Sequence, residues 1–155
     1  MQYFKKKYLI EDDIIKFQVT DNITKKVADF YNNNPFPNYD NNDNKYTLLR
    51  KGDKNPLAYQ FKKYVGFNKN ILEVGPGTCQ FSMYLAIGTN NQIVALDPTL
   101  ESLKLGKIFS KSNDIKNINF VNADIFDDVL KENVFDFVWC NGVLHHTKDP
   151  YNAFK

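Results

Sequence analysis

The 155-residue sequence predicts an α/β fold in which helices flank a parallel β-sheet, and three observations support this class. From residue 70 onward, short apolar runs of strand type alternate with longer segments of helical periodicity. A turn rich in glycine follows the first apolar run, and a carboxylate ends or follows two later runs. Strands that alternate with helices are joined by right-handed crossovers and form a parallel sheet.

The second part of the chain, residues 67–155, is expected to hold this sheet and its ligand site. The expected strands span 70–74, 92–96, 117–121 and 135–140, and the expected helices span 79–87, 99–111, 126–132 and a segment from about residue 150. In open parallel sheets the ligand binds beyond the carboxyl ends of the strands, where the strand order reverses. We therefore expect the site at the ends of the first, second and fourth strands.

Residues 1–66 are predicted to form a mainly helical N-terminal extension, which would act as a lid. The apolar segment 14–19 fits a short strand or an irregular lead-in, and Asp21 or Asn22 is placed to cap a helix that ends at 32–34. The prolines of segment 35–37 exclude a regular helix there, and a further helix is expected at about 57–64. Two uses of the aromatic residues Tyr31, Phe36 and Tyr39 stay open, since they fit a cover over the ligand or packing onto the sheet.

A turn built on Gly75 and Gly77 ends the first predicted strand. Glycine lets the backbone pass close to a ligand, and the helix that follows directs N–H groups at it, which is the layout of a Rossmann-like nucleotide site. Gln80 stands where a dinucleotide fingerprint has its last glycine, and Glu73 would repel a pyrophosphate. A nicotinamide-dependent oxidoreductase is thus disfavoured, and a ligand with positive charge is favoured.

Acidic residues also end the next two strands. Asp97 lies 22 residues after Gly75 (97 minus 75), where a carboxylate accepts hydrogen bonds from ribose hydroxyls. Pro98 directly after it also suits a helix start, so Asp97 fits a helix cap as well, and the two roles are compatible. Asp124 and Ile125 follow the third strand.

The motifs together resemble those of a known family. Glu-x-Gly-x-Gly at 73–77 is similar to motif I of the class I S-adenosylmethionine-dependent methyltransferases, and Asn-Gly-Val-Leu-His-His-Thr at 141–147, with Asp-Pro at 149–150, is typical of their type-11 branch. The resemblance covers nearly the whole chain and implies S-adenosylmethionine as the cofactor, with the adenine amine bonded to Asp124 and the ring packed on Ile125. The expected cofactor-binding residues are Glu73, Gly75, Pro76, Gly77, Thr78, Asp97, Pro98, Asp124, Ile125, Asn141, Gly142 and Val143.

Two features depart from the family pattern. Cys79 stands in place of the third motif glycine, at a position where the helix start and the ligand approach each other closely. A complete class I methyltransferase continues for about three more strands, whereas this sequence ends within the helix after the fourth. We therefore expect a C-terminally truncated domain that holds the cofactor-binding half and leaves an open edge at the fourth strand.

The resemblance implies methyl transfer to an acceptor that the sequence does not identify, with a small molecule as the expected class. Such a transfer needs alignment of donor and acceptor, and a general base only where the acceptor is protonated. His146 is the candidate base; a histidine in this segment also suits orienting the backbone or capping the next helix. The alternative function is a non-catalytic S-adenosylmethionine-binding module that needs the missing half.

Composition sets the remaining expectations. A net charge of +2 gives no case for nucleic-acid binding, and no apolar run of about 18 residues indicates a membrane span. The two cysteines do not make a disulfide framework and fit reduced thiols of a cytoplasmic protein. His145 and His146 lack partners at metal-ligand spacing, so no metal site is expected.

Overall fold

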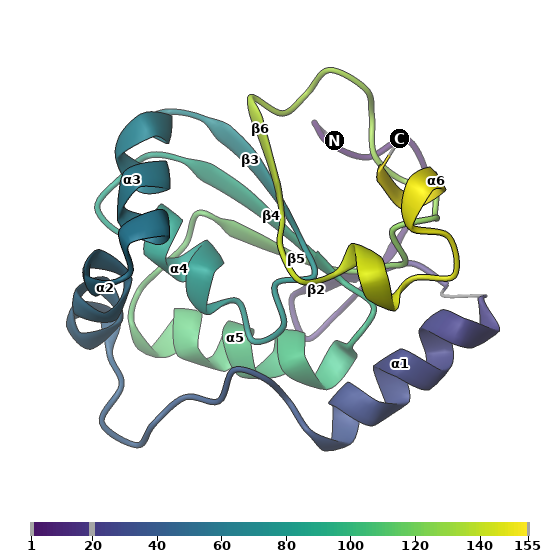
Figure 1. Cartoon of the computed structure of the whole chain (residues 1–155), viewed down its shortest axis with the longest axis horizontal. Coiled ribbons are helices and arrows are strands. Elements are labelled where there is room, and N and C mark those ends of the chain that lie inside the picture. The colour runs from purple at the N-terminus through teal and green to yellow at the C-terminus, as the bar shows by residue number, and fades with distance from the viewer. Residues whose placement is uncertain (1, 19–20, 155) are drawn as a thin grey trace.

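The computed structural model describes residues 2–18 and 21–154, which form a six-stranded sheet flanked by helices (Figure 1). The strand order is β1-β2-β5-β4-β3-β6, and only β1 and β2 pair antiparallel among the described strands. The strands are β1 (Leu9–Glu11), β2 (Ile14–Lys16), β3 (Asn70–Val74), β4 (Gln92–Asp97), β5 (Ile118–Asn122) and β6 (Phe137–Cys140). The predicted α/β class with a mostly parallel sheet is confirmed.

The helices form an N-terminal group, a group between the parallel strands, and short segments after β6. They are α1 (Asn22–Asn33), α2 (Lys45–Lys54), α3 (Pro56–Val65), α4 (Gln80–Ala86), α5 (Leu100–Ser112) and α6 (Pro150–Phe154), with a short 3-10 helix η1 (Leu144–His146). Asp21 begins α1 as predicted, since its carboxylate accepts from the N–H groups of Ile23 and Thr24 at 3.0 Å each. None of the described helices is long and apolar enough to cross a membrane.

The chain order of the strands places the switch point beside β3. From β3 the chain passes through α4, β4 and α5 to β5 on one side, and β6 then pairs with the opposite side of β3. Glu73 lies in register with Ala95 of β4 and with Trp139 of β6. The carboxyl ends of β3, β4 and β6 therefore meet at the position where an open parallel sheet binds its ligand.

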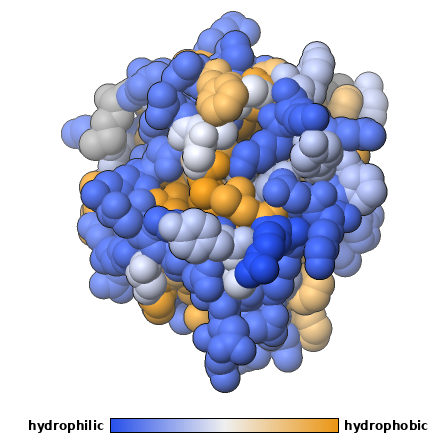
Figure 2. All heavy atoms as spheres, turned by 90° about the vertical axis from the view of Figure 1, so that its left-hand side faces the viewer, coloured by the Kyte–Doolittle hydropathy of each residue, from blue (hydrophilic) through white to orange (hydrophobic). Residues whose placement is uncertain are grey.

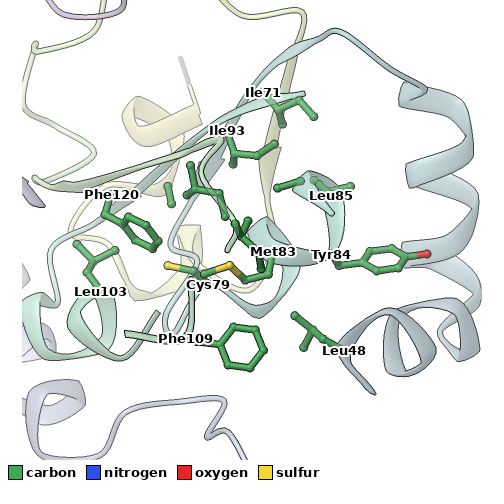
Figure 3. Packing of buried hydrophobic residues seen from close by; sticks show 14 of the residues in the cluster. Leu48, Ile71, Cys79, Met83, Tyr84, Leu85, Ile93, Leu103, Phe109 and Phe120 are labelled. Carbon is green, nitrogen blue, oxygen red and sulfur yellow. The ribbon is translucent and has the colours of Figure 1, made fainter. Parts of the chain in front are cut away.

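Buried hydrophobic side chains cover both faces of the sheet. On one face, α4 and α5 pack their apolar residues onto the strands, and Figure 3 shows Met83 and Leu103 close to Ile93 and Phe120 there. On the other face, Tyr3 and Phe4 join a cluster that shares none of its buried members with the first; its strand members are Leu72, Val74, Val94, Leu96 and Val121. The N-terminal segment thus takes the place that a helix occupies on the first face.

This arrangement explains why the predicted helix at 126–132 is wrong. The segment is a turn followed by extended chain, and Leu130 forms an antiparallel bridge with Phe4. The Lys5 N–H donates to the Val129 carbonyl at 3.0 Å, and the Lys131 N–H donates to the Tyr3 carbonyl at 2.9 Å. Partners from the far end of the chain therefore satisfy backbone groups that a helix would have paired internally.

The N-terminal region is mainly helical, as predicted, but it also contributes β1 and β2 to the sheet. The expected strand at 14–19 is realised at Ile14–Lys16, with residue 19 outside the described residues, and β1 was not expected. The helix expected at 57–64 is α3, whereas α2 was missed. The face that carries α2 and α3 shows hydrophobic side chains in a hollow bordered mostly by hydrophilic ones (Figure 2).

Candidate cofactor site

A cavity of about 530 Å³ lies at the carboxyl ends of β3, β4 and β6. Most of the residues expected from the sequence line it: Glu73, Gly75, Pro76, Gly77, Asp97, Pro98, Asn141, Gly142, Val143 and His146. Thr78, Asp124 and Ile125 are not among its lining residues. The fold therefore gathers side chains from three separate strand ends around one space of the size that small-molecule sites have.

The turn after β3 needs its two glycines. Gly75 and Gly77 have φ values of +67° and +55°, in the left-handed region that favours glycine. A Cβ on Gly75 would lie 2.2 Å from Cγ2 of Val143, and one on Gly77 would lie 2.1 Å from the Phe36 carbonyl oxygen. The turn is therefore fixed by close approach of this chain's own residues.

The Asp97 carboxylate stabilises the glycine turn through a backbone hydrogen bond. Its Oδ2 accepts from the Gly77 N–H at 2.9 Å, and its Oδ1 accepts from the Thr99 N–H at 2.7 Å. Thr99, and not Asp97, is the N-cap residue of α5. Burial raises the pKa of the Asp97 carboxyl, although the two N–H groups favour its charged form.

Glu73 is the second buried carboxyl of the cavity, with an exposed fraction of 5%. The Ser82 hydroxyl donates to its Oε2. Burial raises the pKa of Glu73 to about 7, against the opposing effect of the Ser82 hydrogen bond. A positive charge bound in the cavity would favour the ionised form of this carboxyl.

Segment 36–39 lies across the glycine turn. The Thr78 hydroxyl donates to the Pro37 carbonyl, and the Gln80 side-chain amide donates to the Asn38 carbonyl at 2.9 Å. The Tyr39 hydroxyl donates to the Thr78 carbonyl at 2.7 Å. These contacts connect the N-terminal region directly to the turn.

The sequence left two roles open for three aromatic residues, a cover over the ligand or packing onto the sheet. Tyr31 and Phe36 line the cavity. Tyr39 instead stacks on Phe109 of α5, with ring centroids 4.3 Å apart. Tyr31 and Phe36 therefore lie at the cavity, where a cover stays a prediction, and Tyr39 packs onto α5.

Cys79 is accommodated by the hydrophobic core and does not line the cavity. It adopts the left-handed conformation at φ +65°, as a glycine there would, and its side chain is fully buried near Met83 and Phe109 (Figure 3). Gly106 of α5 leaves room for it, because a Cβ on Gly106 would lie 3.1 Å from both Cβ and Sγ of Cys79. The Cys79 side chain, which replaces the motif glycine, therefore packs against α5 and not into the cavity.

Two buried polar atoms near the strand ends have no hydrogen-bond partner among the described residues. Asp124 is 2% exposed; its Oδ1 accepts from the Phe126 N–H at 3.1 Å, and its Oδ2 is unpaired. Ser102 of α5 is 1% exposed, lines the cavity and has an unpaired hydroxyl. Buried polar groups usually have partners, so both atoms are suited to a ligand.

Sequence reasoning missed several lining residues. Ser102 gave one weak signal, a serine five residues after Asp97 (102 minus 97) at the start of a predicted helix. Other lining residues that were not predicted come from the start of α3, from α4 and from β6: Asn55, Leu57, Ala58, Phe81 and Trp139. No local pattern marks them, because tertiary packing brings them to the cavity.

His146 lines the cavity from η1, and its backbone N–H donates to the Val143 carbonyl at 2.9 Å. The ring of His145 lies next to it, with centroids 3.9 Å apart. Within residues 2–18 and 21–154, no cluster of three or more His, Cys, Asp or Glu side chains is arranged to hold a metal ion.

The fold and the site define a Rossmann-like protein of the methyltransferase type. A family model described as "Methyltransferase domain", that of the type-11 branch, matches residues 72–155, which is more than half of the chain. The chain therefore belongs to this methyltransferase family. Membership implies S-adenosylmethionine as the cofactor.

Two curated proteins are similar to this chain in sequence. A protein of Methanocaldococcus jannaschii, named as a protein N5-glutamine methyltransferase, is 35% identical over 74 residues, or 48% of this chain and 36% of that protein. An RNA methyltransferase of Mycoplasma mobile is 24% identical over 90 residues, or 58% of this chain and 24% of that protein. The chain thus spans about a quarter to a third of the length of these relatives.

A solved structure from Methanococcus maripaludis, described as an S-adenosyl-L-methionine-dependent methyltransferase, shares the fold. The TM-score is 0.59 at 19% identity, and the match covers 89% of this chain and 59% of that one. The described residues also fit the cofactor. Its positive charge suits a cavity that contains buried carboxyls, and its polar groups suit the unpaired Ser102 hydroxyl, whereas the unpaired oxygen of Asp124 belongs to a residue outside the cavity lining.

Proposed function

We propose that this chain forms the cofactor-binding part of an S-adenosylmethionine-dependent methyltransferase that acts on a small molecule. The observation that carries the proposal is the charge of the cavity. Its lining includes the two buried carboxyls of Glu73 and Asp97 and, among the described residues, no lysine or arginine. Such a lining favours a ligand with positive charge and disfavours a pyrophosphate.

Each expected residue has a role in this proposal. Asp97 accepts from the ribose hydroxyls, Asp124 accepts from the adenine amine, and Ile125 packs on the adenine ring. Glu73 neutralises the cationic end of the cofactor. The segments that approach the cofactor with their backbone are Gly75–Thr78, Pro98 and Asn141–Val143.

Ser102 is an addition to the residues expected from the sequence. Its buried, unpaired hydroxyl lines the cavity from the first turn of α5 and gains a partner from a polar atom of the cofactor. Bound S-adenosylmethionine supplies a methyl group that is activated by its positive sulfur. The protein aligns the acceptor with this group, and His146 takes the proton of an acceptor that carries one.

The proposed function also covers the acceptor class, the roles of the two parts of the chain and the compartment. The acceptor is a small molecule and not a nucleic acid, because the cavity lining offers no lysine or arginine for ionic contacts to phosphates. Residues 1–66 form the cover and residues 67–155 the cofactor domain. The cytoplasm is the compartment in which both thiols stay reduced.

Calorimetric titration with S-adenosylhomocysteine, the demethylated product, tests the proposal. We expect micromolar binding that Ser102→Ala weakens about threefold to tenfold, since one hydrogen bond contributes about 1 kcal/mol. Ser112→Ala is the matched control, because Ser112 lies on the same helix and its hydroxyl bonds to the Ile108 carbonyl. Absence of binding to the folded wild-type chain would refute the proposal.

The same titration with NADH distinguishes the oxidoreductase class, which the proposal predicts will not bind. Binding of S-adenosylhomocysteine without methyl transfer to any acceptor would favour the non-catalytic binding module as the function.

A further inference from the structure

The cavity has two chemically different walls. The carboxyls and the glycine turn form one of them. A second set of lining residues, here called the aromatic wall, is apolar and consists of Phe36, Leu57, Ala58, Phe81 and Trp139. No carboxylate or cation belongs to this second set. Under the proposed function, the cofactor lies against the carboxyls and the glycine turn, and the methyl acceptor lies against the aromatic wall.

The sheet register places the aromatic wall beside the cationic end of the cofactor. Trp139 of β6 pairs with Glu73 of β3, and two residues later the chain reaches Asn141. The Trp139 ring lies 4.9 Å from that of Phe81 and 4.5 Å from that of Phe61, so its position is fixed by packing. Trp139 therefore brings the aromatic wall next to Glu73.

The rim of this wall is open and apolar. Leu57 is 59% exposed and Phe36 is 69% exposed, and both line the cavity. A flat apolar ligand that covers them would remove apolar side-chain area from water, which is favourable in proportion to the area buried. An anionic ligand would find no cation there, and its charge would lie near the carboxyl of Glu73.

We propose that the aromatic wall is the acceptor subsite and that it takes an uncharged, apolar molecule of aromatic-ring size. This inference rests on the proposed function and names its acceptor class. Polar side chains that include His146 and Tyr31 line the same cavity. The acceptor thus meets apolar surface on its body and a few polar groups, the usual composition of a small-molecule site.

The test uses two probes of equal ring size and different charge, 2-naphthol and 2-naphthoate, titrated at pH 7 into the full chain loaded with S-adenosylhomocysteine. We expect 2-naphthol to bind at least tenfold more tightly than 2-naphthoate. Calorimetry measures both affinities.

Leu57→Ser is expected to weaken 2-naphthol binding at least threefold and to leave S-adenosylhomocysteine binding unchanged. Leu9→Ser is the matched control, because Leu9 is 76% exposed in β1 and does not line the cavity. Equal binding of the two probes, or an unchanged 2-naphthol affinity in Leu57→Ser, would overturn the inference alone. Failure of S-adenosylhomocysteine to bind would overturn the proposed function and the inference with it.

Discussion

The loops after β3 and β4 differ sharply from those after β5 and β6, although all four meet at one edge of the sheet. Hydrogen bonds within the chain connect the loops after β3 and β4 to each other and to the N-terminal region. Asp97 accepts from Gly77 and Thr99, and segment 36–39 bonds to Thr78 and Gln80. The second pair holds the unpaired Oδ2 of Asp124 and the exposed residues Asn141 and Gly142.

The difference indicates that one half of the site is formed before any ligand arrives. Hydrogen bonds and close backbone approach determine the glycine turn, so its residues contribute to stability as well as to binding. After β5 and β6, by contrast, the Oδ2 of Asp124 is unpaired among the described residues and Asn141 and Gly142 are exposed, so we expect these groups to contribute mainly to binding. Substitutions in the two halves should therefore separate the free energy of unfolding from ligand affinity.

The largest effect on stability is expected for Gly77→Ala. The new Cβ would collide with the Phe36 carbonyl in a backbone conformation that L-residues avoid, so the free energy of unfolding should fall by about 2–4 kcal/mol. Gly88→Ala is the control, since Gly88 also has a positive φ but open space around it, and we expect a loss of about 1 kcal/mol. Urea unfolding measures both; equal losses would show that the Phe36 contact does not fix the turn.

Glu73→Gln should make the free protein more stable at high pH. The native carboxyl has a pKa of about 7, against an ordinary value of 4.5, so the native state binds more protons than the unfolded state between these values. Wild-type stability therefore falls as the pH rises from about 4.5 to 7, and Asp97, whose pKa is also raised, adds to the same trend.

At pH 8 we expect Glu73→Gln to gain about 1–3 kcal/mol, since each pKa unit corresponds to about 1.4 kcal/mol. At pH 5 the gain should be much smaller. Urea unfolding at the two pH values measures the difference, and a gain that does not grow with pH would contradict the assigned burial of this charge.

Asp124→Asn should affect binding without affecting stability. Asparagine keeps an oxygen for the Phe126 N–H and replaces only the unpaired oxygen, so the free energy of unfolding should change by less than about 0.5 kcal/mol. The affinity for S-adenosylhomocysteine should fall about tenfold, because an acceptor becomes a donor. Asp128→Asn, in the same loop but exposed and paired with Lys5, should leave the affinity unchanged in the same calorimetric titration.

The smallest effect is the coupling between Cys79 and Gly106. Gly106→Ala alone should destabilise the protein, because its Cβ would press on Cys79 and on the Thr78 carbonyl. In the Cys79→Gly background we expect the loss to be smaller by about 0.5–1 kcal/mol, a coupling typical of residues in contact. Urea unfolding of the four proteins measures it, and additive losses would mean that Gly106 does not accommodate Cys79.

The sequence predicted the parallel strands well because each is a short apolar run bounded by turns, and strand 70–74 coincides with β3. The glycines and Asp97 were predictable for a related reason, since their roles depend on local backbone position. The helix expected at 126–132 failed because its backbone groups pair with Tyr3 and Lys5, more than a hundred residues away in sequence.

Other misses differ in cause. Helix α2 buries only Leu48 among its described residues, so its apolar periodicity is weak, but the capping box of Asn44 and Thr47 marked its start. Ser102, Leu57 and Trp139 belong to the site only through tertiary packing. The clear local motifs lie in the half of the site that the chain itself holds in place.

Amide hydrogen exchange with and without S-adenosylhomocysteine tests this division most directly. The N–H groups of Gly75, Gly77 and Thr99 are bonded to the Leu96 carbonyl and the Asp97 carboxylate, so they should exchange slowly in the free protein and change little on binding. Amides of segment 141–147 should slow markedly when the ligand binds. Rapid exchange of Gly77 in the free protein, or no change at 141–147 on binding, would contradict a site that is half formed by the chain and completed by its cofactor.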